Sequence, residues 1–300
     1  MTKEKGNGLG MATGYVFYNK KAGQAQDKTD EERIKEYLKG ELKFIDIATP
    51  GSYREIVEQL RPDDYIVLCG GDGTINCFVN QTEGMEIPNE ILYYPNGTGN
   101  DFAHDLGYEK QCEPFSIKEY IKDLPVIIVN DKKSRFLNGI GYGIDGYCCE
   151  VGDELKKIPG KKVNYTAIAI KGLLFHYKTT NATVTVDGVT HTFKGAWLAP
   201  TMNGRFYGGG MMPTPAQQRI GGDGTLSTMV MHGAGKLKTL MVFPSIFKGE
   251  HIKHEKMVKI LTGRKITVEF DRPTALQIDG ETVLGVTSYT AIAGADVLQM

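Results

Sequence analysis

The sequence predicts an α/β protein with two domains: an N-terminal α/β domain built on a mostly parallel sheet, and a C-terminal β-rich domain. Three observations lead to this prediction. Short apolar runs alternate with helical patterns from Tyr15 to about Val129, two of these runs end directly in glycine turns, and the chain after Val126 changes to threonine-rich segments of alternating polarity. With 300 residues, 41% of them hydrophobic, the chain can bury one large core or two modest ones.

The N-terminal elements follow one another in a regular rhythm. Thr29 and Glu32 have the spacing of a capping box, as do Ser52 and Glu55, and apolar residues at helical spacing follow both pairs. Strands that alternate with helices form parallel sheets, which bind ligands at the carboxyl ends of their strands. The predicted elements are strand Tyr15 to Tyr18, helix Thr29 to Leu38, strand Phe44 to Ile47, a helix from Ser52, strand Tyr65 to Cys69 and strand Ile91 to Tyr94.

The pentapeptide Gly-Gly-Asp-Gly-Thr occurs twice, at Gly70 to Thr74 and at Gly221 to Thr225. The first copy ends a predicted strand and leads into a helical pattern, where glycines permit close backbone approach and the N–H groups of the helix start attract an anion. The second copy precedes residues 226–231, whose β-propensity predicts a loop entering a strand. We therefore expect only the first copy to bind phosphate, through Gly70, Gly71, Gly73 and Thr74.

A second glycine turn, residues 95–103, follows the strand Ile91 to Tyr94. Two such turns at successive strand ends can hold a nucleoside triphosphate, with Asp72 and Asp101 as oxygen ligands of Mg²⁺. Asn-Gly and Asp-Gly are also ordinary turn formers, and Asn100 also fits a helix N-cap, but the pairing of the turns favours a nucleotide site. The contacts expected from the second turn come from Asn96, Gly97, Thr98 and Asn100.

The second half of the chain reads as strands with two helical interruptions. Residues 182–186 and 189–193 flank Asp187-Gly188, which is typical of a β-hairpin. Helical patterns cover Asn164 to Tyr177 and Lys236 to Lys248. Further strands are predicted over Lys256 to Leu261, Lys265 to Phe270 and Thr274 to Ile278, and the last of them leads to the turn Asp279-Gly280.

Composition narrows the function classes. A formal net charge of -1 provides no whole-chain field for nucleic acid, so no nucleic-acid partner is expected. Five cysteines without a Cys-x-x-Cys pair argue against a disulfide framework or a zinc module and fit a reducing cytoplasm. Neither a signal peptide nor an apolar run of about twenty residues is present, so we expect a soluble protein.

The residues Gly70 to Thr74, followed by Gly97-Thr98-Gly99-Asn100-Asp101-Phe102-Ala103, resemble the diacylglycerol kinase catalytic-domain family in its soluble bacterial form. The similarity continues through Asn138 to Gly141 and Asp223-Gly224 to Asp279-Gly280-Glu281. The resemblance implies a nucleotide-binding domain over residues 1–129, to which a segment from about residue 285 to 300 returns, and a β-sandwich-like lipid-substrate domain over residues 130–284. It places the active site between the two domains.

The resemblance also assigns roles to single residues. Asn19 and Gly23 correspond to a nucleotide loop of the family, although Lys20 to Ala22 replace its proline and serine. Asp279 or Glu281 corresponds to the catalytic carboxylate that accepts the proton of a lipid hydroxyl, and Asp72 joins them in the catalytic set. Asp223 corresponds to a structural Mg²⁺ loop, in which Ser227 replaces a second aspartate, so a bare turn is the alternative.

The expected function is ATP- and Mg²⁺-dependent phosphorylation of a lipid hydroxyl, with diacylglycerol as substrate and phosphatidic acid as product. The alternatives are a kinase of a soluble substrate such as NAD on the same nucleotide fold, and a non-catalytic nucleotide- or lipid-binding protein. A lipid substrate implies peripheral contact with the inner face of the membrane, for which the basic stretches Lys156 to Lys178 and Lys236 to Lys259 are candidates. An ordinary solvated lysine face is the alternative for each stretch, and a homodimer is left open.

Overall fold

The computed structural model describes residues 12–19, 29–47, 52–158, 160, 163–219 and 224–297. The chain divides into two compact units. The first comprises residues up to Gly97 together with Glu109–Glu119, and the second comprises Thr98–Tyr108 together with the chain from Tyr120 onward. This division differs from the predicted domain boundaries, because the second unit takes in residues 98–108 and 120–129 as well as the C-terminal segment.

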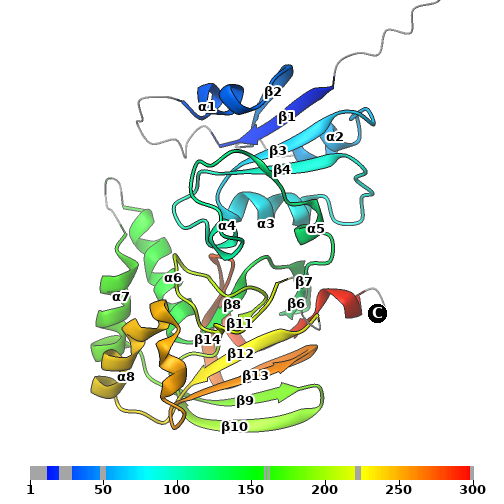
Figure 1. Ribbon diagram of the computed structural model, residues 1–300. Coiled ribbons are helices and arrows are strands. Elements are labelled where there is room, and N and C mark those ends of the chain that lie inside the picture. Colours follow the sequence, from blue (N-terminus) through cyan, green and yellow to red (C-terminus); the bar gives the residue numbers. More distant parts are fainter. Residues whose placement is uncertain are drawn as a thin grey trace, which may run out of the picture. The chain divides into compact units, whose positions relative to one another are not determined.

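The first unit is built on a sheet with the strand order β2-β1-β3-β4-β5 (Figure 1). The pairs among β1, β2, β3 and β4 are parallel, and the short β5 runs antiparallel to β4. This arrangement confirms the predicted mostly parallel sheet. Its strands are β1 (Thr13–Tyr18), β2 (Glu41–Asp46), β3 (Tyr65–Gly70), β4 (Glu90–Pro95) and β5 (Phe115–Ser116), and its helices are α1 (Asp30–Tyr37), α2 (Ser52–Val57) and α3 (Asp72–Gln81).

Helices cover both faces of this sheet. Alternation along β1 directs Val16 and Phe17 to opposite faces, and Val16 belongs to a buried cluster with Ile34 of α1. On the other face the ring of Phe17 packs on Tyr53 of α2 and Phe78 of α3, with ring centroids 4.8 and 6.5 Å away. The expected capping box of α1 is present, since the side chains of Thr29 and Glu32 each bond the other residue's backbone N–H.

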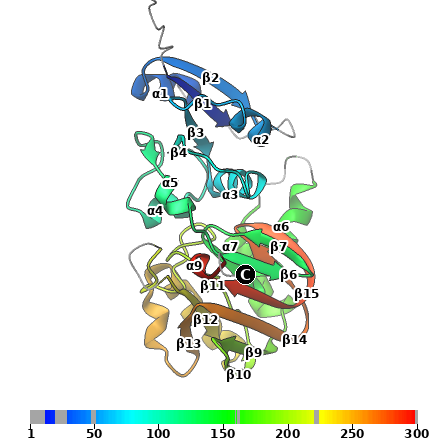
Figure 2. The same ribbon diagram turned by 90° about the vertical axis from the view of Figure 1, so that its right-hand side faces the viewer.

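The second unit holds an antiparallel sheet with the strand order β13-β12-β11-β8-β14-β15-β6-β7, to which the hairpin β9-β10 is joined through β9 (Figure 2). Side chains from strands far apart in that order, such as Ile127, Val184 and Leu226, meet in one buried cluster. The sheet therefore curls around a core, in agreement with the predicted sandwich-like domain. Its strands are β6 (Val126–Val129), β7 (Lys132–Arg135), β8 (Gly139–Tyr142), β9 (Thr180–Val186), β10 (Val189–Ala196), β11 (Thr201–Met202), β12 (Leu226–Met231), β13 (Val258–Gly263), β14 (Lys265–Ile278) and β15 (Glu281–Ile292).

The helices α6, α7 and α8 gather on one side of these strands (Figure 1). A second buried cluster joins Ile144, Leu173 and Val242 from the helices to Met229 and Val258 from the strands. The sequence analysis did not predict the helix α6. Its first half contains Gly146, Tyr147, Cys148 and Cys149, and none of these residues indicates a helix N-cap. The helical segments are α4 (Asp101–Asp105), α6 (Ile144–Lys156), α7 (Tyr165–Lys171), the π-helix η1 (Gly172–His176), α8 (Lys236–Val242), the 3-10 helices η2 (Phe243–Lys248) and η3 (Glu250–Lys253), and α9 (Gly294–Val297), while α5 (Lys118–Ile121) lies at the unit boundary.

Two late features differ from the sequence-based expectations. The strands predicted over residues 265–270 and 274–278 are one strand, β14, whose pairing with β15 shifts register between Glu269 and Thr274. Residues 285–292 do not leave this unit: they belong to β15, which pairs with β14 and β6. Backbone pairing on both sides fixes the segment in the second sheet. Within the described residues, no helix combines the length and apolar character needed to span a membrane.

Gly146 tests how closely α6 packs on β14. A Cβ at Gly146 would lie 1.9 Å from the carbonyl oxygen of Ala275, and backbone cannot move aside as a flexible side chain can. Helix propensity alone favours Gly146→Ala, but overpacking should reverse the sign and lower the free energy of unfolding by about 2–3 kcal/mol. Urea denaturation measures it. As a control, Gly235→Ala, where an added Cβ meets no atom within 4 Å, should change stability by less than about 1 kcal/mol; equal effects would contradict the packing argument.

Candidate active site

The first glycine turn joins β3 to α3 in the first unit. Gly71 is the N-cap of α3 in an extended conformation, and Asp72 is the first residue of the helix. A Cβ at Gly70 would lie 2.2 Å from Oγ1 of Thr74, so this turn requires glycine. At the exposed Gly73 an added Cβ would meet no atom within 4 Å, which leaves room for a ligand to approach the backbone. The N–H groups and dipole of the helix start favour an anion here.

The second turn begins directly beside the first. Gly70 and Pro95 are paired at the ends of β3 and β4, and the backbone N–H groups of Asn96 and Gly97 donate to the carbonyl of Gly70 at 2.8 and 3.0 Å. The hydroxyl of Tyr93 donates to the same oxygen at 3.1 Å. The expectation that both turns meet at one edge of the sheet is therefore confirmed for Asn96 and Gly97.

Polar contacts fix the orientation of Asn96. Its amide Nδ2 donates to both carboxylate oxygens of Asp30, at 2.6 Å each, and its Oδ1 accepts from Nε2 of Gln111 at 3.0 Å. Asp30 opens α1, so the helix that follows β1 is tied to the turn that follows β4. The side chain of Asn96 thus stabilises the turn, and its backbone N–H is held by the bond to the carbonyl of Gly70.

Asn19 lies at the point where the strand order of the sheet reverses. The chain leaves β1 for β2 on one side and returns to β3 on the other, which makes the β1–β3 edge the ligand-binding position of an open α/β sheet. Asn19 follows Tyr18, which pairs with Cys69, so this exposed residue lies level with Gly70. Gly23, Lys20 and Lys21 lie outside the described residues.

The remainder of the second turn belongs to the second unit. Thr98 is exposed, while Asn100 and Asp101 are buried, and Asn100 adopts the left-handed conformation at φ 52° as the N-cap of α4. Asp101 accepts the backbone N–H groups of Gly209 and Gly210 at 2.8 and 2.7 Å, one on each carboxylate oxygen. The glycine loop that contains Gly209 and Gly210 is therefore bonded to the carboxylate predicted to hold Mg²⁺.

Asp279 is held in a three-donor backbone site. Its carboxylate accepts the backbone N–H groups of Leu137, Asn138 and Gly139, the last two at 2.8 and 3.1 Å. Asp279 and Gly280 both have positive φ, at 47° and 96°, and connect β14 to β15 as the expected Asp-Gly turn. These donors stabilise the ionised carboxylate and fix its direction.

Asp101 and Asp279 lie near enough to influence each other. Burial raises the pKa of Asp101, the bonds from Gly209 and Gly210 lower it, and the negative charge of Asp279 raises it further. Two predicted site carboxylates therefore share one negatively charged neighbourhood in the second unit. Glu281, two residues beyond Asp279, is exposed at the start of β15.

A second, half-buried carboxyl is linked to the same turn. Gln277 accepts the backbone N–H of Gly280 at 2.6 Å through Oε1 and donates through Nε2 to Asp145 at 3.1 Å. Asp145 lies in the first turn of α6, and burial raises the pKa of its carboxyl. The sequence analysis missed Asp145 and Gln277; the one available signal was a polar residue, Gln277, between Leu276 and Ile278 in a strand.

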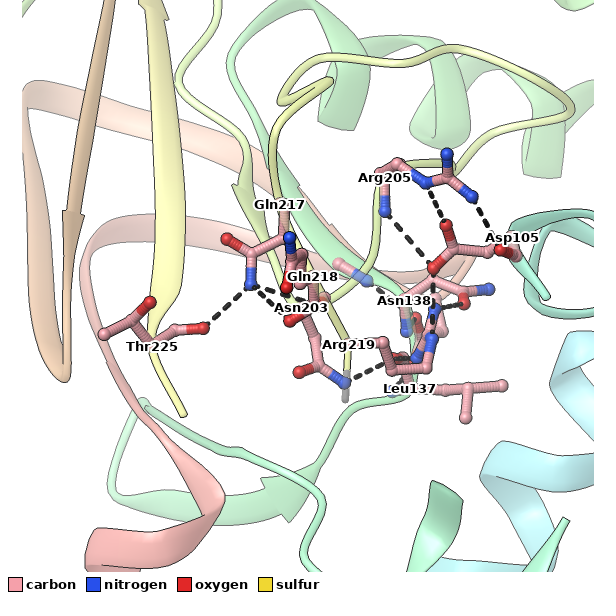
Figure 3. A network of polar contacts seen from close by, with 11 residues as sticks. Asp105, Leu137, Asn138, Asn203, Arg205, Gln217, Gln218, Arg219 and Thr225 are labelled. Atoms are coloured by element: carbon pink, nitrogen blue, oxygen red, sulfur yellow. Dashed lines mark hydrogen bonds and ion pairs between the residues drawn. The ribbon is translucent and has the colours of Figure 1, made fainter. Parts of the chain in front are cut away.

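A buried ion pair joins α4 to the backbone that holds Asp279 (Figure 3). Arg219 and Asp105 have side chains only 3% and 4% exposed, with Nε 3.2 Å from Oδ2. Arg219 also donates to the carbonyl of Leu137 and, at 2.7 Å, to Oδ1 of Asn138, and its guanidinium lies 4.9 Å from the ring centroid of Phe102. Arg205 bonds Asp105 from the surface at 2.8 Å. This network leaves no pattern in the sequence, because its partners are 81 to 114 residues apart.

The side-chain amide of Gln217 holds together the described part of the loop before β12. Nε2 of Gln217 donates to the carbonyls of Asn203, Gln218 and Thr225, the last at 2.8 Å (Figure 3). Its Oε1 accepts the hydroxyl of Ser227 at 2.6 Å. Asp223, the predicted metal ligand, lies outside the described residues.

The expected ligands of a catalytic Mg²⁺ are carboxylates of the candidate site. Among the residues that the structure describes, no group of three or more His, Cys, Asp or Glu side chains could hold a metal ion. Mg²⁺ at kinase sites commonly uses one or two carboxylates and completes its shell with water and substrate phosphates. The buried Asp101, whose ionised form a nearby cation would stabilise, fits such a site.

Because Arg219 is buried, its ion pair with Asp105 should contribute strongly to the free energy of unfolding. Replacing Arg219 by methionine should lower the free energy of unfolding by about 3–5 kcal/mol, because Asp105 loses its buried partner. The matched change Arg205→Met, on a half-exposed arginine that bonds the same carboxylate, should cost about 1 kcal/mol or less. Chemical denaturation of both variants measures the difference, and equal losses would show that burial does not set the strength of this pair.

Comparison with known proteins adds an independent line. The model of the diacylglycerol kinase catalytic domain matches residues 13–125, and that of the YegS C-terminal NAD kinase beta sandwich-like domain matches residues 138–297. A Staphylococcus aureus protein named "putative lipid kinase" is 27% identical over 298 residues, covering 90% of this chain and 91% of its own. A Mycobacterium tuberculosis diacylglycerol kinase is 27% identical over 217 residues, covering 70% and 67%.

A solved structure supports the fold. A crystal structure of a diacylglycerol kinase from Bacillus anthracis has a TM-score of 0.60 at 21% identity and covers 94% of both chains. The two family models together span both units, and the second alone covers more than half of the chain. The protein is therefore a kinase that belongs to the diacylglycerol kinase catalytic-domain family, in the form whose catalytic domain is followed by the YegS-type C-terminal domain.

Proposed function

We propose that this protein is an ATP- and Mg²⁺-dependent lipid kinase that converts diacylglycerol to phosphatidic acid. The observation that carries the proposal is the junction at Gly70, where the N–H groups of Asn96 and Gly97 join the second glycine turn to the first. Two adjacent phosphate-type turns at one sheet edge fit the triphosphate of a nucleotide better than a single turn would. The family membership makes the nucleotide a phosphoryl donor.

The first unit supplies the groups that bind the nucleotide. The backbone of Gly70, Gly71 and Gly73 and the hydroxyl of Thr74 surround the start of α3, where the helix dipole attracts the phosphates. Asn19, Asn96 and Gly97 flank this point at the ends of β1 and β4. Thr98 and Asn100 continue the second turn, and their proposed role is contact with the same nucleotide.

Mg²⁺ would be held by Asp72 and Asp101 together with nucleotide phosphates, and it would neutralise charge that develops on the transferred group. Ionised carboxylates are required for this role. Burial disfavours the ionised form of Asp101, while the backbone N–H groups of Gly209 and Gly210 favour it. We include Asp223 among the proposed metal ligands only for the loop before β12, on which the catalytic step does not depend.

The proposed base is Asp279. The lipid hydroxyl oxygen forms the new bond to the γ-phosphorus, the bond from that phosphorus to the β–γ bridging oxygen breaks, and the hydroxyl proton passes to the carboxylate. Backbone donors from residues 137–139 hold Asp279 in one direction, and it influences Asp101 electrostatically. Glu281 is exposed at the start of β15, so we place it as the second candidate.

The proposed phosphoryl acceptor is the hydroxyl of a lipid. Relatives named as diacylglycerol kinase and as lipid kinase favour a lipid hydroxyl, and a lipid substrate requires contact with a membrane surface, which we propose to be the cytoplasmic face. A homodimer stays a proposal. Because the matching C-terminal domain family is NAD kinase-like, NAD is the soluble acceptor to compare with the lipids.

Purified protein with Mg-ATP and micellar diacylglycerol should release ADP and form phosphatidic acid. Sphingosine, ceramide, an isoprenoid alcohol and NAD serve as competing acceptors in the same assay. Phosphorylation of NAD in preference to every lipid would replace the proposal, and nucleotide binding without ADP release from any acceptor would favour a non-catalytic binding protein.

Asp72→Ala should lower turnover by at least about 100-fold, because the Mg²⁺ that neutralises the developing charge loses a ligand. Its control is Asp63→Ala, which removes an exposed carboxylate from the same unit and should leave turnover within about twofold. Circular dichroism checks that both variants fold. An Asp72→Ala enzyme as active as the control would remove the first glycine turn from the active site.

Asp279→Asn and Glu281→Gln separate the two candidate bases. Asp279→Asn should lower turnover by at least about 100-fold while the affinity for ATP, measured by calorimetry, changes little. It should also lower stability by about 1–3 kcal/mol, since a charged acceptor of three backbone bonds is lost. Glu281→Gln should leave both quantities nearly unchanged. The reverse pattern would assign the base to Glu281, and mild equal effects would exclude both.

A further inference from the structure

Three large apolar side chains stand out on the helical side of the second unit. Phe175, Leu237 and Met241 are 72%, 73% and 75% exposed, although each belongs to a helical segment that packs on the core. Leu237 and Met241 are four residues apart and lie on one face of α8. Phe175 lies in η1. Apolar side chains this exposed are unusual when they occur together rather than singly.

The buried sides of the same helices already complete the core. Leu173 of η1 and Val242 of α8 belong to the cluster that includes Met229 and Val258 of the sheet. These segments are therefore apolar on the inner side and also on the outer side. A helix with an apolar outer face either has a partner or lies at a membrane interface.

The two outer faces belong to one surface. Nζ of Lys236 at the start of α8 donates to the carbonyl of Leu174 in η1 at 2.8 Å, which holds the two segments together. Figure 1 shows α7, which η1 continues, beside α8. Phe247 of η2 and Ile170 of α7, both about two-fifths exposed, extend the surface. We call the exposed side chains Ile170, Phe175, Leu237, Met241 and Phe247 the α7–α8 face.

A π turn directs Phe175 outward. The backbone N–H of Tyr177 donates to the carbonyl of Gly172 five residues earlier, at 2.8 Å, which widens the helix at this point. In an uninterrupted α-helix Phe175 would lie seven residues after the buried Ile168, on nearly the same face. The wider turn moves Phe175 off the buried side while Leu173 and Tyr177 remain inside.

The two segments that carry the face contain basic but no acidic residues. The sequence contains no Asp or Glu over residues 164–178 or over residues 235–249, whereas the whole chain carries 36 acidic and 35 basic residues. Exposed lysines border the face in both segments, at Lys171, Lys178, Lys236, Lys238 and Lys248. The segregation is local, and it complements an anionic surface.

We propose that the α7–α8 face docks on the surface of an anionic lipid bilayer, with its apolar side chains in the headgroup boundary and its lysines on the headgroups. The proposal rests on the proposed lipid kinase function and names the surface by which the enzyme would reach its substrate. A second copy of the chain is disfavoured as occupant, because a two-fold contact through this face would bring the lysines of both copies together.

Sedimentation with vesicles tests the docking surface in the absence of nucleotide. The full chain should bind vesicles of phosphatidylcholine and phosphatidylglycerol at least about fivefold more tightly than phosphatidylcholine alone, and added salt should remove the difference. Met241→Gln should weaken binding about fivefold, and Phe175→Gln with Met241→Gln at least about tenfold. Val189→Gln, which alters an apolar residue of the β9-β10 hairpin that is 61% exposed and lies outside the α7–α8 face, should bind as the wild type does.

Charge variants separate the lysines from the apolar side chains. Lys238→Gln with Lys248→Gln should weaken binding to the mixed vesicles about threefold and leave binding to phosphatidylcholine unchanged. Lys132→Gln with Lys133→Gln, on the exposed part of β7, is the matched control and should have no effect. All of these variants should phosphorylate a water-soluble short-chain diacylglycerol at the wild-type rate.

Three results would overturn the docking surface. The first is wild-type vesicle binding by the Phe175 and Met241 variants, and the second is equal binding to both kinds of vesicle by the wild type. The third is a dimer, detected by light scattering, that Met241→Gln dissociates, since this would assign the face to a second copy. Vesicle binding that depends on the α7–α8 face, without phosphorylation of any lipid, would keep the docking surface and reject the proposed kinase substrate.

Discussion

The second unit depends on the buried ion pair between Arg219 and Asp105. Burying either charge alone would be costly, so the pair, together with the bonds from Arg219 to Leu137 and Asn138, holds α4 against the segment that leads into β8. That segment in turn offers its backbone N–H groups to Asp279. One guanidinium therefore links the helix that carries Asp101 to the turn that carries Asp279.

The first unit uses backbone rather than charge for the corresponding task. The carbonyl of Gly70 accepts the N–H groups of Asn96 and Gly97 and the hydroxyl of Tyr93, so the ends of β3 and β4 are held together by one oxygen. Because a Cβ at Gly70 would collide with Thr74, glycine is required at the point where the strand turns into the helix. A turn held in this way would need little reorganisation to bind the phosphate of the proposed nucleotide, which is the advantage of a preorganised site.

The helical side of the second unit combines two tasks on the same segments. Leu173 and Val242 fill the core, while Phe175, Leu237 and Met241 remain outside among lysines. The π turn between Gly172 and Tyr177 separates the two sets within a single helix. In the proposed docking, only the outer set of side chains would meet the membrane.

The sequence by itself determined the parallel sheet, both glycine turns, the capping box of α1 and the Asp279-Gly280 hairpin, because each depends on neighbours a few residues apart. The roles proposed for Asp72, Asp101 and Asp279 also start from local motifs. Only the tertiary structure decided that Arg219 pairs with Asp105, that Gln277 links Asp145 to Gly280, and that β15 stays in the second sheet. It also turned Phe175 outward and left Leu173 buried. Contacts between residues a hundred positions apart leave no periodic pattern in a chain, since their energy arises only when folding brings them together in a buried environment.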